Sequence, residues 1–443
     1  MIKANTIKYV SIIFILFVAK IMLSMIESQI NERSNNRLHA QRAIEKSWTG
    51  DQTILASVLT VPYKKKVITR IFDKELDKYV EKTKWIDESI FLLPKDLSLS
   101  AKLNHQTLAK GIYQVPVYNS ELVIDGIFNL EKIEKLAKKP QIKIMDNAYL
   151  SFGISDSRGV SGSPLLLINQ QDNQVFSGSK LDFFPSGFHG KVLIKDKKEA
   201  FDFKVKVQVK GMGRISFVTT GNENKVSINS DWPHPSFDGA FLPTNRKISD
   251  TGYSAQWKTG IFSTNIENTI EQCFKSQCMD LYDSSFGVNH IQSVDIYLKS
   301  LRSVKYGLLV VIITFTIFVL YEVLNKNIRI HPISYLLTGM ALAIFFLLLV
   351  ALSEHISFAL SYWISSIACS GLIAYYVRYL SHSIRHGTSV FVLLNSFYFI
   401  LFFIIRSEDH ALLSGSILLF VLLATVISVT KKIDWYQMGK KDN

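Results

Sequence analysis

The stretch YLLTGMALAIFFLLLVAL, residues Tyr335–Leu352, decides the fold class because it carries no charged side chain. Four runs of the same kind accompany it: Gly307–Leu320, Phe358–Val377, Val390–Ile405 and Ala411–Val429. With a few flanking residues, each run reaches the roughly 20 residues that cross a bilayer as a helix. A helix in the core of a soluble protein is shorter and keeps a polar face. The sequence therefore predicts a membrane domain of five helices over residues 304–430.

A sixth apolar run lies at the N-terminus, after a short basic start. After Lys8 of this basic start, Ile7–Ile26 is interrupted only by Lys20, and Glu27 follows where a signal peptidase site would need small residues. We expect an uncleaved anchor over residues 1–26, with a cleavable signal peptide as the alternative. The predicted fold class is an α-helical membrane protein with six transmembrane helices.

The short loops predict the orientation of these helices through the positive-inside rule. On one side of the membrane block, the short turns over residues 353–357 and 406–410 contain a single Lys or Arg, which is Arg406. Cations gather on the other side, at Lys3, Lys8, Lys326, Arg329, Arg378, Arg385, Lys431, Lys432, Lys440 and Lys441. Both termini, including a tail over residues 431–443, are therefore expected in the cytoplasm. Residues 27–303 then lie outside the cytoplasm, which is the periplasm if the source is a Gram-negative bacterium.

Residues 27–303 have the pattern of a β-rich domain of the antiparallel, α+β kind, inserted between the first and second helices. A polar helix over residues 29–48 continues from the anchor, and short apolar segments separated by Pro, Gly, Asn and Asp follow it. A short helix near Leu130–Lys138 indicates a sub-lobe break around residues 130–145. The expected strands include Thr53–Tyr63, Lys65–Phe72, Ser89–Leu93, Leu97–Leu103, Gly111–Tyr118, Glu121–Asn129 and Phe201–Lys210.

Charge and motifs limit the classes of function. The net charge of +13 is spread along the chain, without a basic run interleaved with aromatics, so we expect no nucleic-acid partner. G-x-S-x-G, H-E-x-x-H, a P-loop and a Rossmann fingerprint are absent, and no cofactor or metal site is expected. The sequence thus predicts a protein that is not an enzyme. A periplasmic hydrolase with dispersed catalytic residues stays an alternative.

The most unusual stretch of the soluble part is Asp231–Pro243, DWPHPSFDGAFLP. Its prolines predict a stiff, extended connection, and Trp232 and Phe237 must bury their rings somewhere. His234 between two prolines invites a ligand or acid/base role, although a hydrogen-bonded structural histidine is the commoner outcome.

Two further features of the soluble part have a structural and a chemical interpretation. Asp156 and Arg158 could bind an anion through the guanidinium, or could close a turn at a strand end as an ion pair. Cys273 and Cys278 lie on the oxidising side and can close a small disulfide loop. Metal binding by these cysteines is disfavoured, because no pair of histidines stands nearby.

Ionisable residues in the membrane block are the remaining candidates. Glu322 lies near the inner end of the second helix, and Glu354 and His355 form the turn after the third. Such residues are functional candidates by default, but all three stand near an interface, where anchoring suffices. We predict that Glu354 or His355 lies within hydrogen-bonding reach of the periplasmic domain or the first helix. The helices contain too few other acids and bases to line an ion path, which argues against a transporter. A lipid-handling protein remains an alternative.

Nearly the whole chain resembles the CreD family of bacterial inner-membrane proteins. The matching residues are Glu32-Arg33, Arg37, Ala43-Ile44, Asp156, Arg158, Gly159, Asn229–Phe237, Gly239, Phe241–Pro243, Gly252, Gln256-Trp257, His331-Pro332, Tyr335–Leu337, Gly339, Leu347–Leu349, Ala351–His355 and Ile433–Tyr436. Leu55–Val58 departs from the family, which tends to carry Gly-Pro there, and the Cys273/Cys278 pair is not part of its pattern. The resemblance implies an inner-membrane protein linked to envelope stress, envelope integrity and colicin tolerance, without a defined catalytic activity.

The predicted function is a membrane scaffold whose periplasmic domain contacts unknown envelope proteins or glycans while its helices contact the lipid bilayer. The alternative is a transporter or lipid-handling protein that uses the six-helix bundle.

Overall fold

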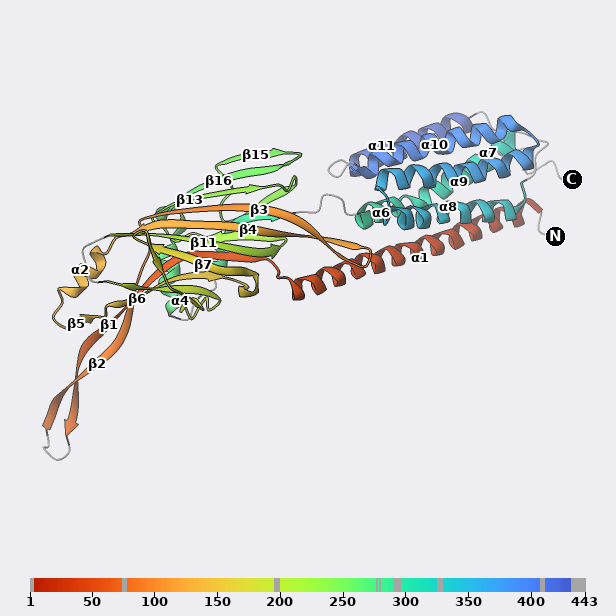
Figure 1. The fold of residues 1–443 in the computed structure, drawn as a ribbon. Helices are drawn as coiled ribbons and strands as arrows, with labels where there is room; N and C mark the ends of the chain where they lie inside the picture. The colour runs from red at the N-terminus through yellow and green to blue at the C-terminus, as the bar shows by residue number, and fades with distance from the viewer. Residues whose placement is uncertain are drawn as a thin grey trace. The chain divides into compact units, whose positions relative to one another are not determined.

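The computed structural model describes residues 4–73, 78–194, 200–275, 278, 280–290, 296–324, 330–406 and 411–431. It divides into two compact units, drawn in Figure 1: residues 39–293 form a β-rich unit, and residues 1–38 with 294–443 form a helical unit. These boundaries differ from the expected ones at residues 27 and 303. Most cations of the turn at 326–329 and of the tail at 431–443 lie outside the described residues.

The β-rich unit contains two sheets. Among the described residues, one has nine strands: β14 (Pro235–Gly239), β17 (Phe286–His290), β12 (Arg214–Val218), β1 (Gln52–Asp73), β6 (Asn147–Ile154), β10 (Gly187–Leu193) and β9 (Val175–Ser177) in order, with β2 (Lys78–Leu92) and β5 (Ile142–Ile144) also paired to β1. The other, of eight described strands, runs β15 (Asn245–Ser249), β16 (Gly252–Gly260), β13 (Glu223–Ser230), β3 (Asp96–Lys110), β4 (Tyr113–Phe128), β11 (Phe201–Met212), β7 (Val160–Ile168) and β8 (Gln171–Asn173). Most pairs are antiparallel, but β1 pairs β12 and β3 pairs β13 in parallel.

Alternating side chains explain how the two sheets pack. Along β11 every second residue from Phe201 to Val209 is buried, and the lysines and acids between them are exposed. The buried faces of both sheets share one hydrophobic core. Phe152 meets Phe203 across it at 5.8 Å between ring centroids, and Trp257 meets Phe286 at 5.7 Å. The unit is therefore held by apolar burial between the sheets.

Several expected breaks between strands are absent. Residues 53–72 form one strand, β1, and residues 113–128 form one strand, β4. The pairing of β1 with β6 shifts register between Leu55 and Val58, the segment that departs from the family pattern. A bulge there bends β1 without ending it. The region of the expected sub-lobe break holds α2 (Glu131–Ala137) and β5, inside the single β-rich unit.

The outer face of the nine-stranded sheet carries a second, smaller core. Leu55 and Val218 of the sheet pack with Ile266 and Ile270 of α4 (Ile266–Phe274). Two short helices flank α4 along the chain: α3 (Ile261–Thr264) precedes it, and α5 (Asp280–Asp283), whose Leu281 belongs to this core, follows it. Because α4 covers it, this sheet is buried on both faces here.

The helical unit contains long apolar helices. The helices are α1 (Ala4–Ser47), α6 (Ile296–Lys305), α7 (Gly307–Leu324), α8 (Pro332–Ser353), α9 (Phe358–Ser381), α10 (Ile384–Arg406) and α11 (Ala411–Thr430). Five spans within the described residues have the length and composition to cross a membrane: Ile7–Ser47, Ile296–Val323, Pro332–Ser353, Phe358–Ser381 and Ile384–Arg406. Within α11, Leu413–Ser428 is apolar but shorter. The membrane character is confirmed, and the sixth span stays a prediction.

Polar side chains join the membrane helices. Tyr362 of α9 donates a hydrogen bond to the carbonyl of Tyr398 in α10 at 2.8 Å, and Asn395 of α10 donates to Ser370 of α9 at 2.7 Å. In an apolar solvent such bonds hold helices together, since no water competes for them.

Candidate functional site: a buried histidine cluster beside the aromatic segment

The Asp231–Pro243 segment is built into the sandwich as an edge strand. Its centre forms β14, which pairs with β17 from Pro235↔His290 to Gly239↔Phe286. The ring of Phe237 lies 5.7 Å from that of Tyr253 and 5.9 Å from that of Trp257. The aromatic segment thus packs against its own domain and closes one end of the core.

Gly239 is required where the segment turns away from β17. Its φ of +99° lies in a region that L side chains rarely adopt, and a Cβ there would stand 2.3 Å from the carbonyl oxygen of Ser285. The glycine of the family motif is therefore explained by backbone geometry.

His290 lies under this segment as a neutral, hydrogen-bonded imidazole. Its Nδ1 is 2.8 Å from the carbonyl oxygen of Gly213, which can only accept, so Nδ1 carries the hydrogen. The hydroxyl of Tyr253 then donates to Nε2 at 2.9 Å. Burial and, to a smaller extent, the neighbouring His105 together lower the pKa of His290 to about 3.

His105 pairs with Asp231 in the same cluster. Its backbone N–H donates to both carboxylate oxygens, at 3.0 and 3.2 Å, and its Nδ1 lies 2.7 Å from Oδ1 of Asp231. The imidazole stands between the rings of Trp232 and His290, at centroid distances of 5.0 and 4.5 Å. Burial lowers the pKa of His105, although the hydrogen bond that the imidazole donates to Asp231 opposes that shift.

The Nε2 of His105 is buried and has no hydrogen-bond partner among the described residues. An aspartate and the histidine it orients are two of the three members of a catalytic triad, but a triad also needs a hydroxyl or thiol at Nε2 of the histidine. Because none lies there in the part of the chain that the structure describes, the arrangement positions a base without a nucleophile.

His234, the histidine singled out in the sequence, lies outside this cluster. It is exposed, and its side chain makes no hydrogen bond or ion pair with the described residues. Sequence reasoning found the right segment, since Trp232 and Asp231 belong to the cluster. It missed His105 and His290, because they come from β3 and β17 and nothing in the sequence links them to Asp231.

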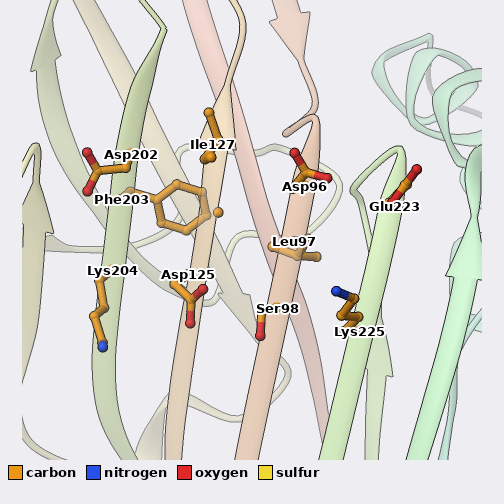
Figure 2. Close-up of a pocket in the computed structure, with 11 residues that line it drawn as sticks. Asp96, Leu97, Ser98, Asp125, Ile127, Asp202, Phe203, Lys204, Glu223 and Lys225 are labelled. Atoms are coloured by element: carbon orange, nitrogen blue, oxygen red, sulfur yellow. The ribbon is translucent and has the colours of Figure 1, made fainter.

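A shallow cavity of about 420 Å³ lies on the outer face of the eight-stranded sheet (Figure 2). Figure 2 shows two rows of side chains across the strands: Lys225, Ser98, Asp125 and Lys204 in one, Glu223, Asp96, Ile127 and Asp202 in the other. Burial raises the pKa of Asp125, and Lys204 opposes the rise. In the described ranges, no group of three or more His, Cys, Asp or Glu side chains is placed to hold a metal ion.

Asp156 and Arg158 meet each other at a strand end. The guanidinium donates from Nε at 2.9 Å and from Nη2 at 2.5 Å to the carboxylate, and its Nη1 donates to the carbonyl of Lys46 at 2.7 Å. The hydrogen bond from Arg158 lowers the pKa of Asp156. This geometry engages the guanidinium within the fold and ties the turn to the last turn of α1.

Cys273 and Cys278 are joined in a disulfide at the end of α4. Cys273 is buried in the second core, and Cys278 packs against that core. The bridge therefore closes a short loop on the outer face of the nine-stranded sheet, away from the histidine cluster.

The acidic candidates of the helical unit contact other helices. Glu354 caps the C-terminus of α8 and accepts a hydrogen bond from Tyr297 of α6 at 3.0 Å. Nε of Arg33, on α1, lies 3.9 Å from the same carboxylate. His355 is exposed, and its backbone N–H bonds to Leu352. Glu322 of α7 forms an ion pair with Lys8 of α1.

Comparison with known proteins places the chain among its relatives. The family model described as inner membrane protein CreD matches residues 4–436. The chain belongs to the CreD family. This CreD-family chain is 28% identical to the inner membrane protein CreD of Escherichia coli (strain K12) over 421 residues, which is 94% of this chain and 90% of that protein.

Solved structures add little to this CreD assignment. An M1 zinc metallopeptidase from Deinococcus radiodurans aligns with a TM-score of 0.21 and 8% identity, over 38% of each chain. Native yeast LTA4 hydrolase aligns with a TM-score of 0.18 and 10% identity, over 37% of this chain and 27% of that one. Similarity this low supports no inference about the fold or the activity of the CreD-family chain.

Proposed function

We propose that this CreD-family chain is a non-enzymatic scaffold of the inner membrane whose β-rich domain binds envelope components in the periplasm. Both termini are then cytoplasmic, α11 is the sixth transmembrane helix, and residues 27–303 lie outside the cytoplasm. The cations of the short loops at one side of the membrane block support this orientation. The role in envelope integrity rests on the resemblance to the family.

The observation that carries the binding role is a projecting ribbon, which we call the arm, made of residues 66–73 and 78–85. β1 pairs β5 as far as Lys65, and from Lys66↔Trp85 to Asp73↔Lys78 it pairs only β2 in the described chain. Figure 1 shows the two strands extending beyond the sheets. A two-stranded ribbon is marginally stable by itself, so an arm of this length is expected to serve a contact.

The contacts of the acidic membrane residues support a scaffold over a transporter. Glu322 pairs with Lys8, and Glu354 meets Tyr297 and Arg33. Carboxylates held by neighbouring helices stabilise the bundle, whereas a transport site needs groups that exchange a ligand.

Removal of the arm tests the proposal. Lys66 and Trp85 lie directly opposite each other, so residues 67–84 can be replaced by Asn-Gly, the sequence preferred in a two-residue hairpin. We expect the shortened protein to accumulate and fold normally, because no residue of the deleted segment whose burial is described belongs to a hydrophobic core of the unit. We expect cells that carry it to lose resistance to envelope-active agents as completely as cells without the protein.

A matched control is the His105→Gln variant, which removes the base of the buried cluster. A scaffold that acts through the arm keeps its function in this variant wherever the protein folds. Full function without the arm, or loss of function in a folded His105→Gln protein, would refute the proposal and favour a periplasmic hydrolase or the bundle.

A further inference from the structure

The outer edge of β2 is open along the strand. β2 spans Lys78–Leu92, and β1 is its only partner among the described strands. Every second residue of such an edge presents its N–H and C=O groups outward, ready to pair with another strand. The first property of the arm is therefore an unused set of backbone hydrogen-bonding groups.

The arm and Ile86, the residue next to it on β2, expose large apolar side chains on both faces of the ribbon. Trp85 and Ile68 share one face, since Trp85 lies opposite Lys66 and Ile68 opposite Thr83. Their side chains are 46% and 55% exposed. Ile86, 40% exposed, points to the other face. A strand added beside β2 would cover part of this apolar surface.

The charge of the arm favours one kind of partner strand at the open edge of β2. Three acidic residues of β2, one in the arm and two just beyond it, are already paired: Glu81 with Arg70, Asp87 with Lys64, and Glu88 with Lys65. Lys82 and Lys84 on β2 form no ion pair with any described residue and are exposed. They are two residues apart, so both point to the same face. The β2 edge therefore presents uncompensated positive charge beside its open backbone groups.

Two other occupants fit this surface less well. A second copy added edge to edge through β2 would bring Lys82 and Lys84 close to the same lysines of its partner, and like charges across strands repel. A bilayer interior would leave the N–H and C=O groups of both edges without partners. An extended segment with acidic side chains satisfies both the backbone and the lysines.

We infer that the outer edge of β2 binds an extended acidic segment of a partner protein as an added β-strand, with carboxylates at alternate positions facing Lys82 and Lys84. This inference rests on the proposed scaffold function and names the chemistry of its partner. Main-chain hydrogen bonds provide the affinity, and the alternating carboxylates provide the selectivity.

The test uses the full chain in detergent micelles and a fluorescent peptide of about nine residues in which Glu alternates with Val. Binding is followed by fluorescence anisotropy. We expect Lys82→Glu with Lys84→Glu to raise the Kd at least about tenfold. Lys204→Glu with Lys225→Glu, the same change on the outer face of the other sheet, leaves the Kd unchanged. A peptide N-methylated at alternate residues keeps its charge but cannot pair with the edge, and does not bind.

Equal binding of the peptide to the Lys82/Lys84 variant, or of the N-methylated peptide to the native chain, overturns the inference. Binding of phosphatidylglycerol vesicles through Lys82 and Lys84, in place of the peptide, also overturns it and assigns the arm to a lipid surface. If the peptide does not bind, but removal of the arm still abolishes envelope function, only the inference of an acidic partner strand is refuted. If envelope function is retained without the arm, the proposed scaffold function is itself refuted.

Discussion

Single residues of the buried cluster make the β-rich unit sensitive to acid. His290 has a pKa of about 3 in the folded chain, well below the value of about 6.5 of a free imidazole. Between these values the unfolded chain takes up a proton that the folded chain does not. The contribution of His290 to the free energy of unfolding is therefore fully present above pH 6.5 and is lost as the pH falls toward 3.

This linkage predicts a measurable loss of stability in mild acid. From pH 6.5 to pH 5, the free energy of unfolding should fall by about 2 kcal/mol through His290 alone. His290→Gln can still donate to the carbonyl of Gly213 but cannot titrate, so its stability should change less over the same range. Chemical denaturation of the β-rich unit at both pH values measures the difference.

The exposed His234 provides the control, because His234→Gln leaves the buried cluster unchanged. A native chain whose unfolding free energy does not change between the two pH values would contradict the assignment of a buried neutral His290.

The histidine cluster also marks how far sequence reasoning reaches at the residue scale. The prolines and aromatics of residues 231–243 indicate an unusual segment, and this segment does lie beside the cluster. The partners are not predictable, because His105 and His290 approach Asp231 only after three strands from two sheets have come together. In the sequence, each is one histidine in an ordinary strand pattern.

At the scale of elements, helices were easier to predict than exposed strands. A membrane helix is apolar on all sides because the bilayer is its solvent, and this leaves a long, clear signal. The first ten residues of β2, KYVEKTKWID, were not predicted, since a ribbon exposed on both faces has no apolar alternation. Only its end, Ser89–Leu92, which lies nearer the core, shows the expected pattern.

The pairing of α1 with α7 leads to a prediction at this scale. Lys8 and Glu322 join the two helices, and either partner left alone would be a poorly solvated charge. Lys8→Glu or Glu322→Lys should each destabilise the helical unit by roughly 2 kcal/mol. The exchange Lys8→Glu with Glu322→Lys restores the pair and should recover most of the lost stability, measured as Tm in detergent.

The same exchange separates a structural pair from a transport site. If Glu322 carried a substrate or proton, a lysine at its position would abolish envelope function even in a stable protein. A stable but inactive exchange variant would therefore support the transporter, and an active one supports the scaffold.

For the whole molecule, the orientation in the membrane leads to a labelling experiment. Thr83 is exposed on β2, and the free Cys369 is buried among the membrane helices. Thr83→Cys should react with a membrane-impermeant maleimide in cells whose outer membrane has been permeabilised. The native chain should stay unlabelled. Labelling of Thr83→Cys only after lysis would place the β-rich domain in the cytoplasm and contradict the proposed topology.

The parallel pairing of β1 with β12 has a consequence for how the β-rich domain is made. Gln52 lies beside Ile215, and Asp96 of β3 lies beside Glu223 of β13. Contacts between such distant segments close late, because the long intervening chain must first be brought together. During synthesis, β1 and β3 therefore keep open edges until β12 and β13 have followed. During that interval the growing chain is most exposed to aggregation and proteolysis, and depends most on chaperones.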